Sequence, residues 1–405
     1  MRKFHIILAA VATLLFGAAC SKVVPTAEDP VDEAVSFEVA NFMHRTKANV
    51  AFDTDKTFTT YSWLYTPDSE EAQSFMQPAT VAYVKSLEVW KAVNRPYYWP
   101  KTGYLNFISY AQEPAPSDVS EMELEGKGSA IVVSYGAFGV NTQDQQIDPV
   151  YMEIKPNDDP LLAEAAYRYY RKTPEMWNDV TVDEGDPGFT GVPTLFHHLA
   201  AKVTVIIRFD ASQEPQNGHE WYLQVNKASF SCVKKGILQA QFEDPMVTGQ
   251  SWPFTDDDGV CWIPRKDDDS NAVLENFDAE SMGKQYAAGD APDPLYLFGA
   301  FNEETEEYEG ITVLPQYLDS GQTLSLNLTL TNTYQGESPI VETFDLPIAF
   351  YYGPNAQANH SFSNTIDAWK MGHHYVYTVT IKPNSTVSFD PAVVNWETSA
   401  TDYPY

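Results

Sequence analysis

The most constraining feature of this chain is a two-residue alternation of apolar and polar side chains in several short runs. In the clearest run, Leu324–Leu330, four leucines alternate with serine, asparagine and threonine. Residues two apart point to the same face of a strand, so the pattern predicts a strand with one buried and one solvated face. Two further runs repeat it, with predicted inward residues Val203, Val205, Ile207 and Phe209 in the first and Tyr375, Tyr377, Val379 and Ile381 in the second.

Short runs of this kind, separated by Pro, Gly, Asn and Asp, favour an all-β chain built of antiparallel sandwiches. Residues 161–172 are the exception: Asp159 and Pro160 precede them as a possible N-cap and first helical residue, and we predict a helix there. The polar run Asp210–Gly218 indicates a domain boundary. The sequence therefore predicts an N-terminal sandwich over 35–210 and a C-terminal sandwich over 211–405.

The charge balance excludes two classes of partner. The chain has 56 Asp and Glu against 25 Lys and Arg, a net charge of −31. Nucleic acids are held mainly by clustered Lys and Arg, so we expect no nucleic-acid partner. A basic patch for an anionic membrane is not expected either. Hydrophobic residues make up 43% of the chain, which is ample for folded cores.

The N-terminus has the pattern of an export signal. Arg2 and Lys3 precede the apolar run Ile6–Phe16, which is too short to span a hydrocarbon core of about 30 Å. Small residues then precede Cys20, as in bacterial lipoprotein signals, although Gly17 stands where Leu is commonest. We expect a signal peptide over 1–19, lipidation of Cys20 and a tether over 20–34. An ordinary secretory signal with an incidental cysteine is the alternative.

Two cysteines remain after Cys20. Cys232 and Cys261 would close a loop of about thirty residues if they formed a disulfide, which an exported protein can hold. Equally, both could be small buried side chains. Their spacing matches no metal-binding motif, and the sequence leaves the two interpretations open.

No pattern of catalytic residues stands out, and we expect no enzyme, cofactor or metal site. GxSxG, HExxH and P-loop motifs are absent from the sequence. The pairs His197–His198 and His373–His374 would point to opposite faces of a strand, so each is predicted to hold one buried and one exposed ring. The acidic runs Asp256–Gly259 and Asp267–Asp269 lack the ligand spacing of an EF-hand and are interpreted as solvated loops.

Six stretches carry a recognisable pattern in a fixed order: Tyr97–Tyr110, Asp158–Ala165, Val192–Val203, Leu314–Gln316, Trp369–Tyr377 and Val387–Trp396. Together they resemble the fimbrillin family, the Mfa-like subunits and tip proteins of type V pili of Gram-negative anaerobes. Their predicted roles are structural: large inward anchors at Trp99, Phe107, Trp369 and Trp396, and turns at Gly103 and Gly372.

The resemblance implies two transthyretin-like, Greek-key β-sandwich domains in tandem. It also implies a lipid-anchored precursor at the outer membrane that is cleaved after an arginine, joins a surface fimbria by strand addition and mediates cell adhesion. The implied partners are other fimbrial subunits and a host glycan or protein ligand. A surface lipoprotein that binds glycans through exposed aromatics and never polymerises is the main alternative, and an acidic glycosidase is a remote one.

Arg45 is the predicted processing site. It follows the alternating run Ala34–Met43, whose Val35, Phe37 and Val39 share one face, and it lies in the short basic break His44–Lys47. Cleavage there would detach the first strand. The run 393–405 is the candidate donor strand. Alternatively, Arg45 is a surface turn residue.

Overall fold

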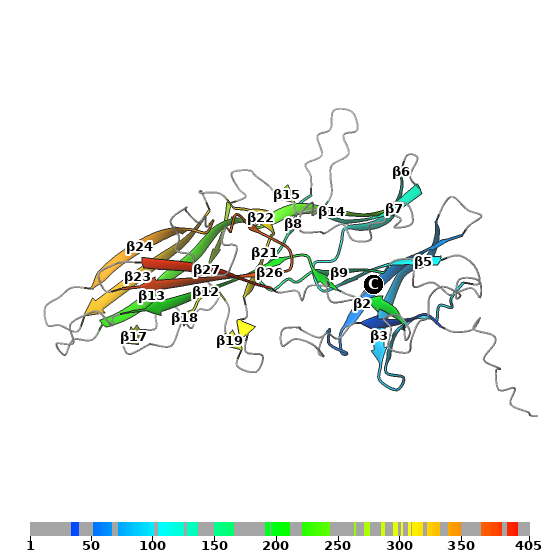
Figure 1. Ribbon diagram of the computed structural model, residues 1–405, viewed down its shortest axis with the longest axis horizontal. Helices are drawn as coiled ribbons and strands as arrows, with labels where there is room; N and C mark the ends of the chain where they lie inside the picture. Colours follow the sequence, from blue (N-terminus) through cyan, green and yellow to red (C-terminus); the bar gives the residue numbers. More distant parts are fainter. Residues whose placement is uncertain are drawn as a thin grey trace, which may run out of the picture.

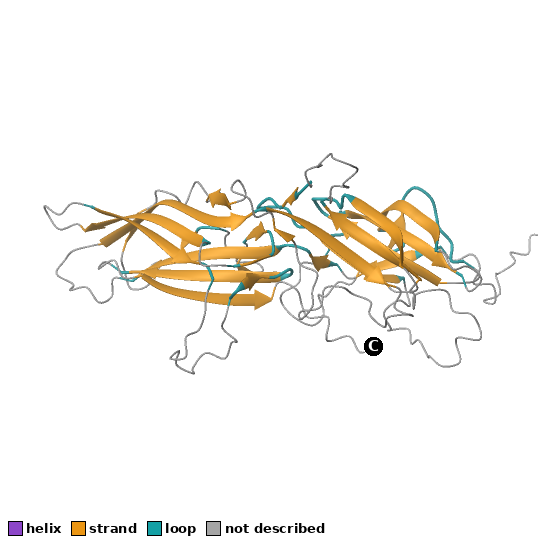
Figure 2. Cartoon of the chain, turned by 90° about the horizontal axis from the view of Figure 1, so that it is seen from above, coloured by secondary structure: helices purple, strands orange, loops and turns teal. Residues whose placement is uncertain are grey.

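The structure is a computed structural model of the full chain. It describes residues 34–39, 52–66, 72–100, 104–124, 128–136, 150–165, 191–194, 196–210, 221–243, 263–264, 271–275, 285–287, 295–298, 301–302, 307–308, 310–318, 322–332, 339–349, 366–382 and 387–395. These residues form strands and loops without a helix, which confirms the all-β prediction (Figure 2). Within this part of the chain, no helix has the length and apolar character needed to cross a membrane.

The molecule is elongated and has two lobes of stacked sheets (Figure 1). The lobe on the right, the N-lobe, contains sheets 1 and 2. Sheet 1 has the strand order β10 (Val192–Thr194), β1 (Ser36–Val39), β4 (Val89–Ala92), β3 (Gln73–Val84), β2 (Thr57–Tyr65), β5 (Tyr104–Ala111), β9 (Leu161–Ala165) and β11 (His197–His198). Sheet 2 has the order β15 (Ile263–Pro264), β14 (Lys235–Glu243), β7 (Gly128–Tyr135) and β6 (Asp118–Leu124), with β8 (Met152–Glu153) also paired to β14.

The lobe on the left, the C-lobe, contains sheets 3 and 4. Sheet 3 has the order β18 (Leu295–Tyr296), β12 (Ala201–Phe209), β26 (His373–Ile381) and β27 (Val387–Asn395), with β21 (Ile311–Val313) also paired to β12. Sheet 4 has the order β16 (Asn271–Glu275), β13 (Trp221–Val233), β23 (Thr323–Asn332) and β24 (Ile340–Pro347), with β17 (Gln285–Ala287) also paired to β13. Two small ribbons complete the described strands: β19 (Phe301–Asn302) with β20 (Glu307–Tyr308), and β22 (Gln316–Tyr317) with β25 (Ala368–Trp369).

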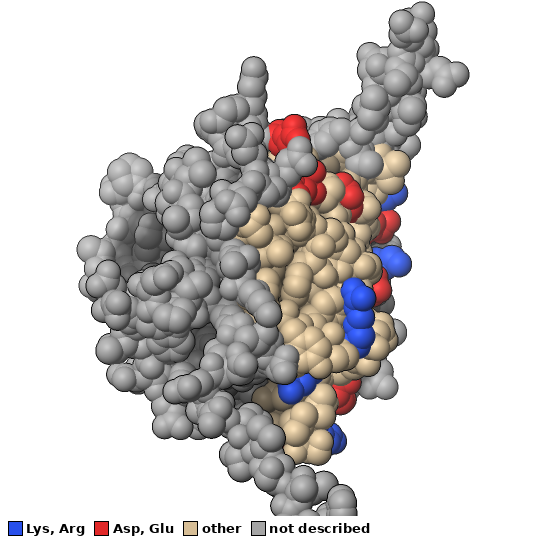
Figure 3. Space-filling view, turned by 90° about the vertical axis from the view of Figure 1, so that its right-hand side faces the viewer, with Lys and Arg blue, Asp and Glu red and all other residues tan. Residues whose placement is uncertain are grey.

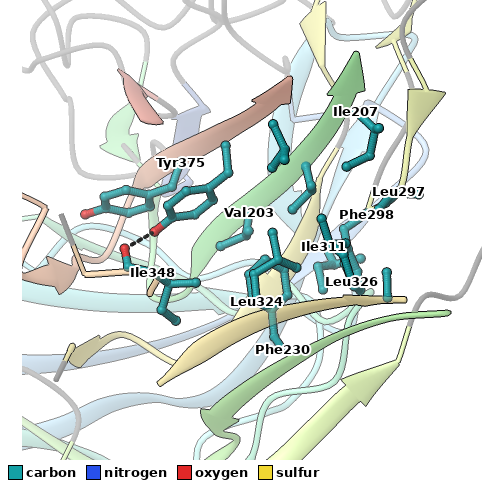
Figure 4. Close-up of a cluster of buried hydrophobic side chains, with 14 of the residues drawn as sticks. Val203, Ile207, Phe230, Leu297, Phe298, Ile311, Leu324, Leu326, Ile348 and Tyr375 are labelled. Carbon is teal, nitrogen blue, oxygen red and sulfur yellow. Dashed lines mark hydrogen bonds between the residues drawn. The ribbon is translucent and has the colours of Figure 1, made fainter. Parts of the chain in front are cut away.

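The C-lobe core lies between sheets 3 and 4, and it confirms the inward faces that the alternation predicts. All four leucines of β23 and all four predicted inward residues of both β12 and β26 are buried in it. Side chains from β12, β13 and β23 meet in its centre (Figure 4). Trp369 is the predicted anchor: its indole N–H donates to the hydroxyl of Tyr377 at 2.8 Å, and its ring meets Phe230 edge-on.

The N-lobe has two cores, one on each face of sheet 1. The β1 core lies on the face that includes Phe37, Phe58 and Phe107. The inter-sheet core lies between sheet 1 and sheet 2 and includes Trp63 and Tyr135. Strands β2 and β5 are therefore buried on both faces, with the β1 core on one side and the inter-sheet core on the other.

The predicted boundary at residue 210 does not separate the lobes. β12 precedes this residue yet belongs to the C-lobe, where it pairs in parallel with β26 over eight residues. β14 follows it yet belongs to the N-lobe, where it pairs with β7. The turn-rich run at 210 instead connects β12 and β13, which lie in the two facing sheets of one lobe. β1 and β10 also pair in parallel, so the sheets are not purely antiparallel.

The predicted helix over 161–172 is wrong where the structure describes it. Leu161–Ala165 form β9, which pairs with β5 and β11. Leu161 is buried in the β1 core and Leu162 in the inter-sheet core, so the strand is apolar on both faces and lacks the alternation that marks a strand. The carboxylate of Asp159 contacts His198 rather than capping a helix.

A buried histidine should make the protein sensitive to acid. Burial, with the nearby charge of Lys202, lowers the pKa of His374 from 6.5 to about 3, and its Nε2 lies 2.9 Å from Thr204 Oγ1. Between pH 6.5 and 3, His374 is therefore protonated in the unfolded chain but neutral in the folded one. The free energy of unfolding falls over this range as the pH drops, by about 1.4 kcal/mol per pH unit from this group.

We expect His374→Gln to weaken this pH dependence when urea unfolding is compared at pH 7 and pH 5. His373→Gln, at the half-buried neighbouring position, is the matched control and should keep the parent's pH dependence. An unchanged dependence in His374→Gln would contradict the assignment.

Candidate functional site: the groove that holds the first strand

The first described segment of the chain is a separate strand inserted between two others. β1 pairs antiparallel with β4, where Phe37 faces Trp90, and parallel with β10, where Phe37 faces Val192. Ahead of it, the backbone N–H of Val35 donates to the carbonyl of Tyr97 at 2.7 Å. Both backbone edges of β1 are therefore paired, although the strand is only four residues long.

Burial of alternate side chains confirms the predicted inward face of this strand. Val35, Phe37 and Val39 are 3%, 2% and 7% exposed. Phe37 packs edge-on against Phe58 at 5.6 Å and Phe107 at 5.7 Å between ring centroids. Burying three such side chains stabilises the docked strand by roughly 5–9 kcal/mol. Without β1, the N-lobe would therefore have an apolar groove with two unpaired strand edges.

The wall formed by β4 combines apolar and basic side chains. Leu87, Val93 and Tyr98 are exposed at or near this strand. Lys91 lies on β4 opposite Ser36 of β1, and the guanidinium of Arg95 lies 4.6 Å from the ring centre of Tyr97. The end of the molecule that lies on the right in Figure 1 has a broad uncharged area with charges along its margin (Figure 3). In a chain of net charge −31, basic residues beside the groove favour an acidic or neutral occupant.

Sequence reasoning missed β2, the strand whose Phe58 faces Phe37 across the core. Its next buried positions are polar: Thr60 and Ser62 are fully buried. The hydroxyl of Ser109 donates to Thr60 Oγ1 at 2.9 Å, and Thr60 Oγ1 lies within hydrogen-bond distance of the carbonyl of Ile108. Thr60 is therefore paired inside the sheet, whereas Ser62 Oγ is buried without a hydrogen-bond partner. Because both buried positions are polar, the sequence of β2 shows no apolar alternation to detect.

The predicted lipidation and processing residues lie outside the described part of the chain. This applies to Cys20 and Arg45, and also to Gly103, Trp396 and the acidic runs at 256–259 and 267–269. Of the candidate donor run 393–405, Val393–Asn395 belong to β27 and pair with β26. A donor formed by this run would therefore begin after residue 395 unless β27 leaves its sheet.

The other predicted residues have structural positions. Gly372 has a φ of 68°, as predicted for a turn. Phe107 and Trp369 are buried anchors, whereas Trp99 is half-buried against the β1 core. Cys232 is fully buried, and burial raises the pKa of its thiol to about 12. Because Cys261 lies outside the described residues, the pairing of the two cysteines stays a prediction.

The histidine pairs differ from each other. His374 is buried and His373 half-buried, close to the predicted arrangement. His197 and His198 are both half-buried, and His198 Nδ1 lies 2.7 Å from the carboxylate of Asp159, which holds this ring at the lobe junction. Among the described residues, no three His, Cys, Asp or Glu side chains come together in a way that could hold a metal ion.

Among known proteins, this chain is similar to several solved structures. No family model matches the chain. No curated protein sequence matches it either. A fimbrial protein from Bacteroides vulgatus is 13% identical with a TM-score of 0.46, over 90% of this chain and 99% of that one. A putative cell adhesion protein from Bacteroides uniformis is 15% identical with a TM-score of 0.35, over 90% and 99%. The tip fimbrial protein Mfa3 from Porphyromonas gingivalis is 10% identical with a TM-score of 0.32, over 90% and 100%.

The groove predicts a large effect for one side chain of β1. Phe37→Ala should destabilise the protein by about 3–5 kcal/mol, because it removes a ring that fills the space between Phe58 and Phe107. Leu87→Ala, at a side chain 57% exposed, is the control and should change stability by less than about 0.5 kcal/mol. Urea unfolding of the full chain measures both, and equal effects would contradict the role given to Phe37.

Proposed function

We propose that this protein is a structural or tip subunit of a fimbria. In this proposal it is non-enzymatic, is exported as an outer-membrane lipoprotein, and is assembled by strand addition after proteolysis into a surface fimbria that mediates cell adhesion. Its two lobes would be the two transthyretin-like sandwiches that the sequence resemblance implies, with β12 and β14 exchanged across the junction. The observation that carries the proposal is the position of β1.

β1 has the properties of a replaceable strand. It is short, lies at the start of the described chain, and lies between β4, which stays paired with β3 without it, and β10, whose described strand pairing is with β1 alone. The basic break with Arg45 follows it six residues after Val39. Cleavage after Arg45 would leave β1 held only by hydrogen bonds and side-chain packing. Loss of β1 would then expose backbone groups that an incoming strand can satisfy, as in strand-addition complexes.

The chain also contains a candidate occupant for the groove of a second copy. The run 396–405 follows β27, carries Glu397 and Asp402, and has no Lys or Arg. Its charge is complementary to Lys91 and Arg95 beside the groove. Ten extended residues reach about 33 Å, which is ample for a strand of the length of β1. The partners in this proposal are therefore other fimbrial subunits, through strand and groove.

The glycan-binding alternative receives little support from the described surface. The aromatic side chains that are exposed there are Tyr98 and Tyr317. They belong to different lobes, so they do not form one stacking platform for a sugar. Saturable binding on a glycan array, lost on mutation of Tyr98 or Tyr317, would nonetheless favour this function, as would the absence of the protein from immunolabelled filaments.

Processing at Arg45 is tested by Arg45→Ala. We expect this variant to keep the unprocessed N-terminus, to retain β1 in its groove and to lose polymer ladders on gels. Lys47→Ala, two residues away in the same basic break, is the matched control and should polymerise like the parent. If Arg45→Ala forms the same polymer ladders as the parent and has the same mature N-terminus, Arg45 is excluded as the processing site.

Export as a lipoprotein is tested by Cys20→Ser. The variant should carry no acyl mass and should leave the membrane fraction, because a serine hydroxyl does not replace the acylated thiol. Cys261→Ser is the control and should remain in the membranes. An acylated, membrane-bound Cys20→Ser protein would contradict the assignment of the anchor.

A further inference from the structure

The chain crosses between the two lobes at several points, and we call the region that contains them the junction layer. At each crossing, two consecutive residues belong to different cores: the N-lobe inter-sheet core on one side and the C-lobe core on the other. The crossings described are Ala200 to Ala201, Cys232 to Val233, and Val313 to Leu314. The second is nearly continuous, because Lys234 alone separates β13 of the C-lobe from β14 of the N-lobe.

The side chain of Gln316 joins two of these crossings. Its Nε2 donates to the carbonyls of Val233 and Leu314, both at 2.8 Å. Its Oε1 accepts from the backbone N–H of Val233 at 3.0 Å and from the amide of Gln322. The side chain is 4% exposed, and both donors and both lone pairs of its amide are used.

This amide replaces a missing strand. β23 pairs with β13 as far as Phe230, and its ladder ends there. Three residues later, the amide of Gln316 contacts both the N–H and the carbonyl of Val233, as a peptide group of a neighbouring strand would. The other edge of Val233 is paired with Asn271 of β16. A glutamine suits this position because one terminal group supplies both a donor and an acceptor.

Other contacts hold the same layer together. The hydroxyl of Thr312 on β21 donates to the carbonyl of Lys155 at 2.8 Å, and the N–H of Thr312 donates to Pro156. The N–H of Gly372 donates to Ala200 at 2.9 Å, and the N–H of Ile154 donates to Lys234 at 3.1 Å. Each of these bonds joins a segment of one lobe to a crossing or to a loop of the other lobe.

We infer that the hydrogen bonds of the Gln316 side chain fix the two lobes as one rigid body. The crossings supply the covalent links, and the amide of Gln316 removes the rotation about them by tying the β13–β14 crossing to the Leu314 crossing. Truncation of the side chain leaves the N–H and carbonyl of Val233 without this partner at the point where the strand passes between the cores. The inference does not depend on the proposed function.

The test measures the distance between the lobes in the full chain. Spin labels are placed on Leu87→Cys in the N-lobe and Val341→Cys in the C-lobe, both exposed positions, in a Cys20→Ser, Cys261→Ser background that keeps the buried Cys232. We expect one narrow distance distribution in this parent and a clearly broader one in Gln316→Ala. The melting midpoint of Gln316→Ala should fall by about 2–8 °C.

Two further variants keep the inference falsifiable. Gln239→Ala changes the same residue type at an exposed position of β14 and should leave the distance distribution of the parent unchanged. If Gln316→Ala does not fold, Thr312→Val replaces it: this variant removes the hydroxyl bond to Lys155 but not the backbone bond to Pro156, and should broaden the distribution less. A broad distribution in the parent would overturn the inference. A distance distribution as narrow as the parent's in a folded but destabilised Gln316→Ala would also overturn it. If Gln316→Ala does not fold, an equally narrow distribution in Thr312→Val would do the same.

Discussion

The structure depends on pairing backbone groups between segments that are distant in the sequence. A helix satisfies its own N–H and carbonyl groups, but the described part of this chain has no helix, so each buried strand needs neighbours on both edges. β12 finds one of them in β26, about 170 residues later, and β14 finds one in β7, about 100 residues earlier. The same need explains why β1 has a groove and why a side-chain amide completes β13.

This constraint also determines what a removable strand can be. A central strand such as β2 is buried on both faces and paired on both edges along its length, so its loss would disrupt two cores. β1 contributes to one core through alternate side chains. Its neighbour β4 stays paired with β3 without it, whereas β10, the end strand of the sheet, pairs with β1 alone among the described strands. In the proposed strand addition, β1 would be exchanged while β2, β3, β4 and β5 keep their ladders with one another, and the incoming strand would restore the pairing of β10.

Local alternation allowed part of the fold to be predicted from the sequence. The faces of β12, β23 and β26 follow from it because each strand has one core side, and the first strand follows for the same reason. β9 could not be recognised, because Leu161 and Leu162 face two different cores. The lobe boundary could not be recognised either: residues 192–203 read as one strand, whereas β10, β11 and β12 divide them between sheets of both lobes. For the groove, the sequence identifies the inward residues of β1 but not its neighbours β4 and β10.

Three of the described edge strands have features that would limit unwanted pairing in the proposed assembly. An unprotected edge would accept the same kind of strand as the groove does. β27, an edge of sheet 3, has Pro391 opposite Tyr377. Pro391 has no backbone N–H to donate to a further strand. β6, one edge of sheet 2, carries Asp118, Glu121 and Glu123, and β24, one edge of sheet 4, carries Glu342 and Asp345. In the proposed assembly, an acidic incoming strand would be repelled by both acidic edges and attracted by Lys91 and Arg95 beside β1, so charge would favour the groove.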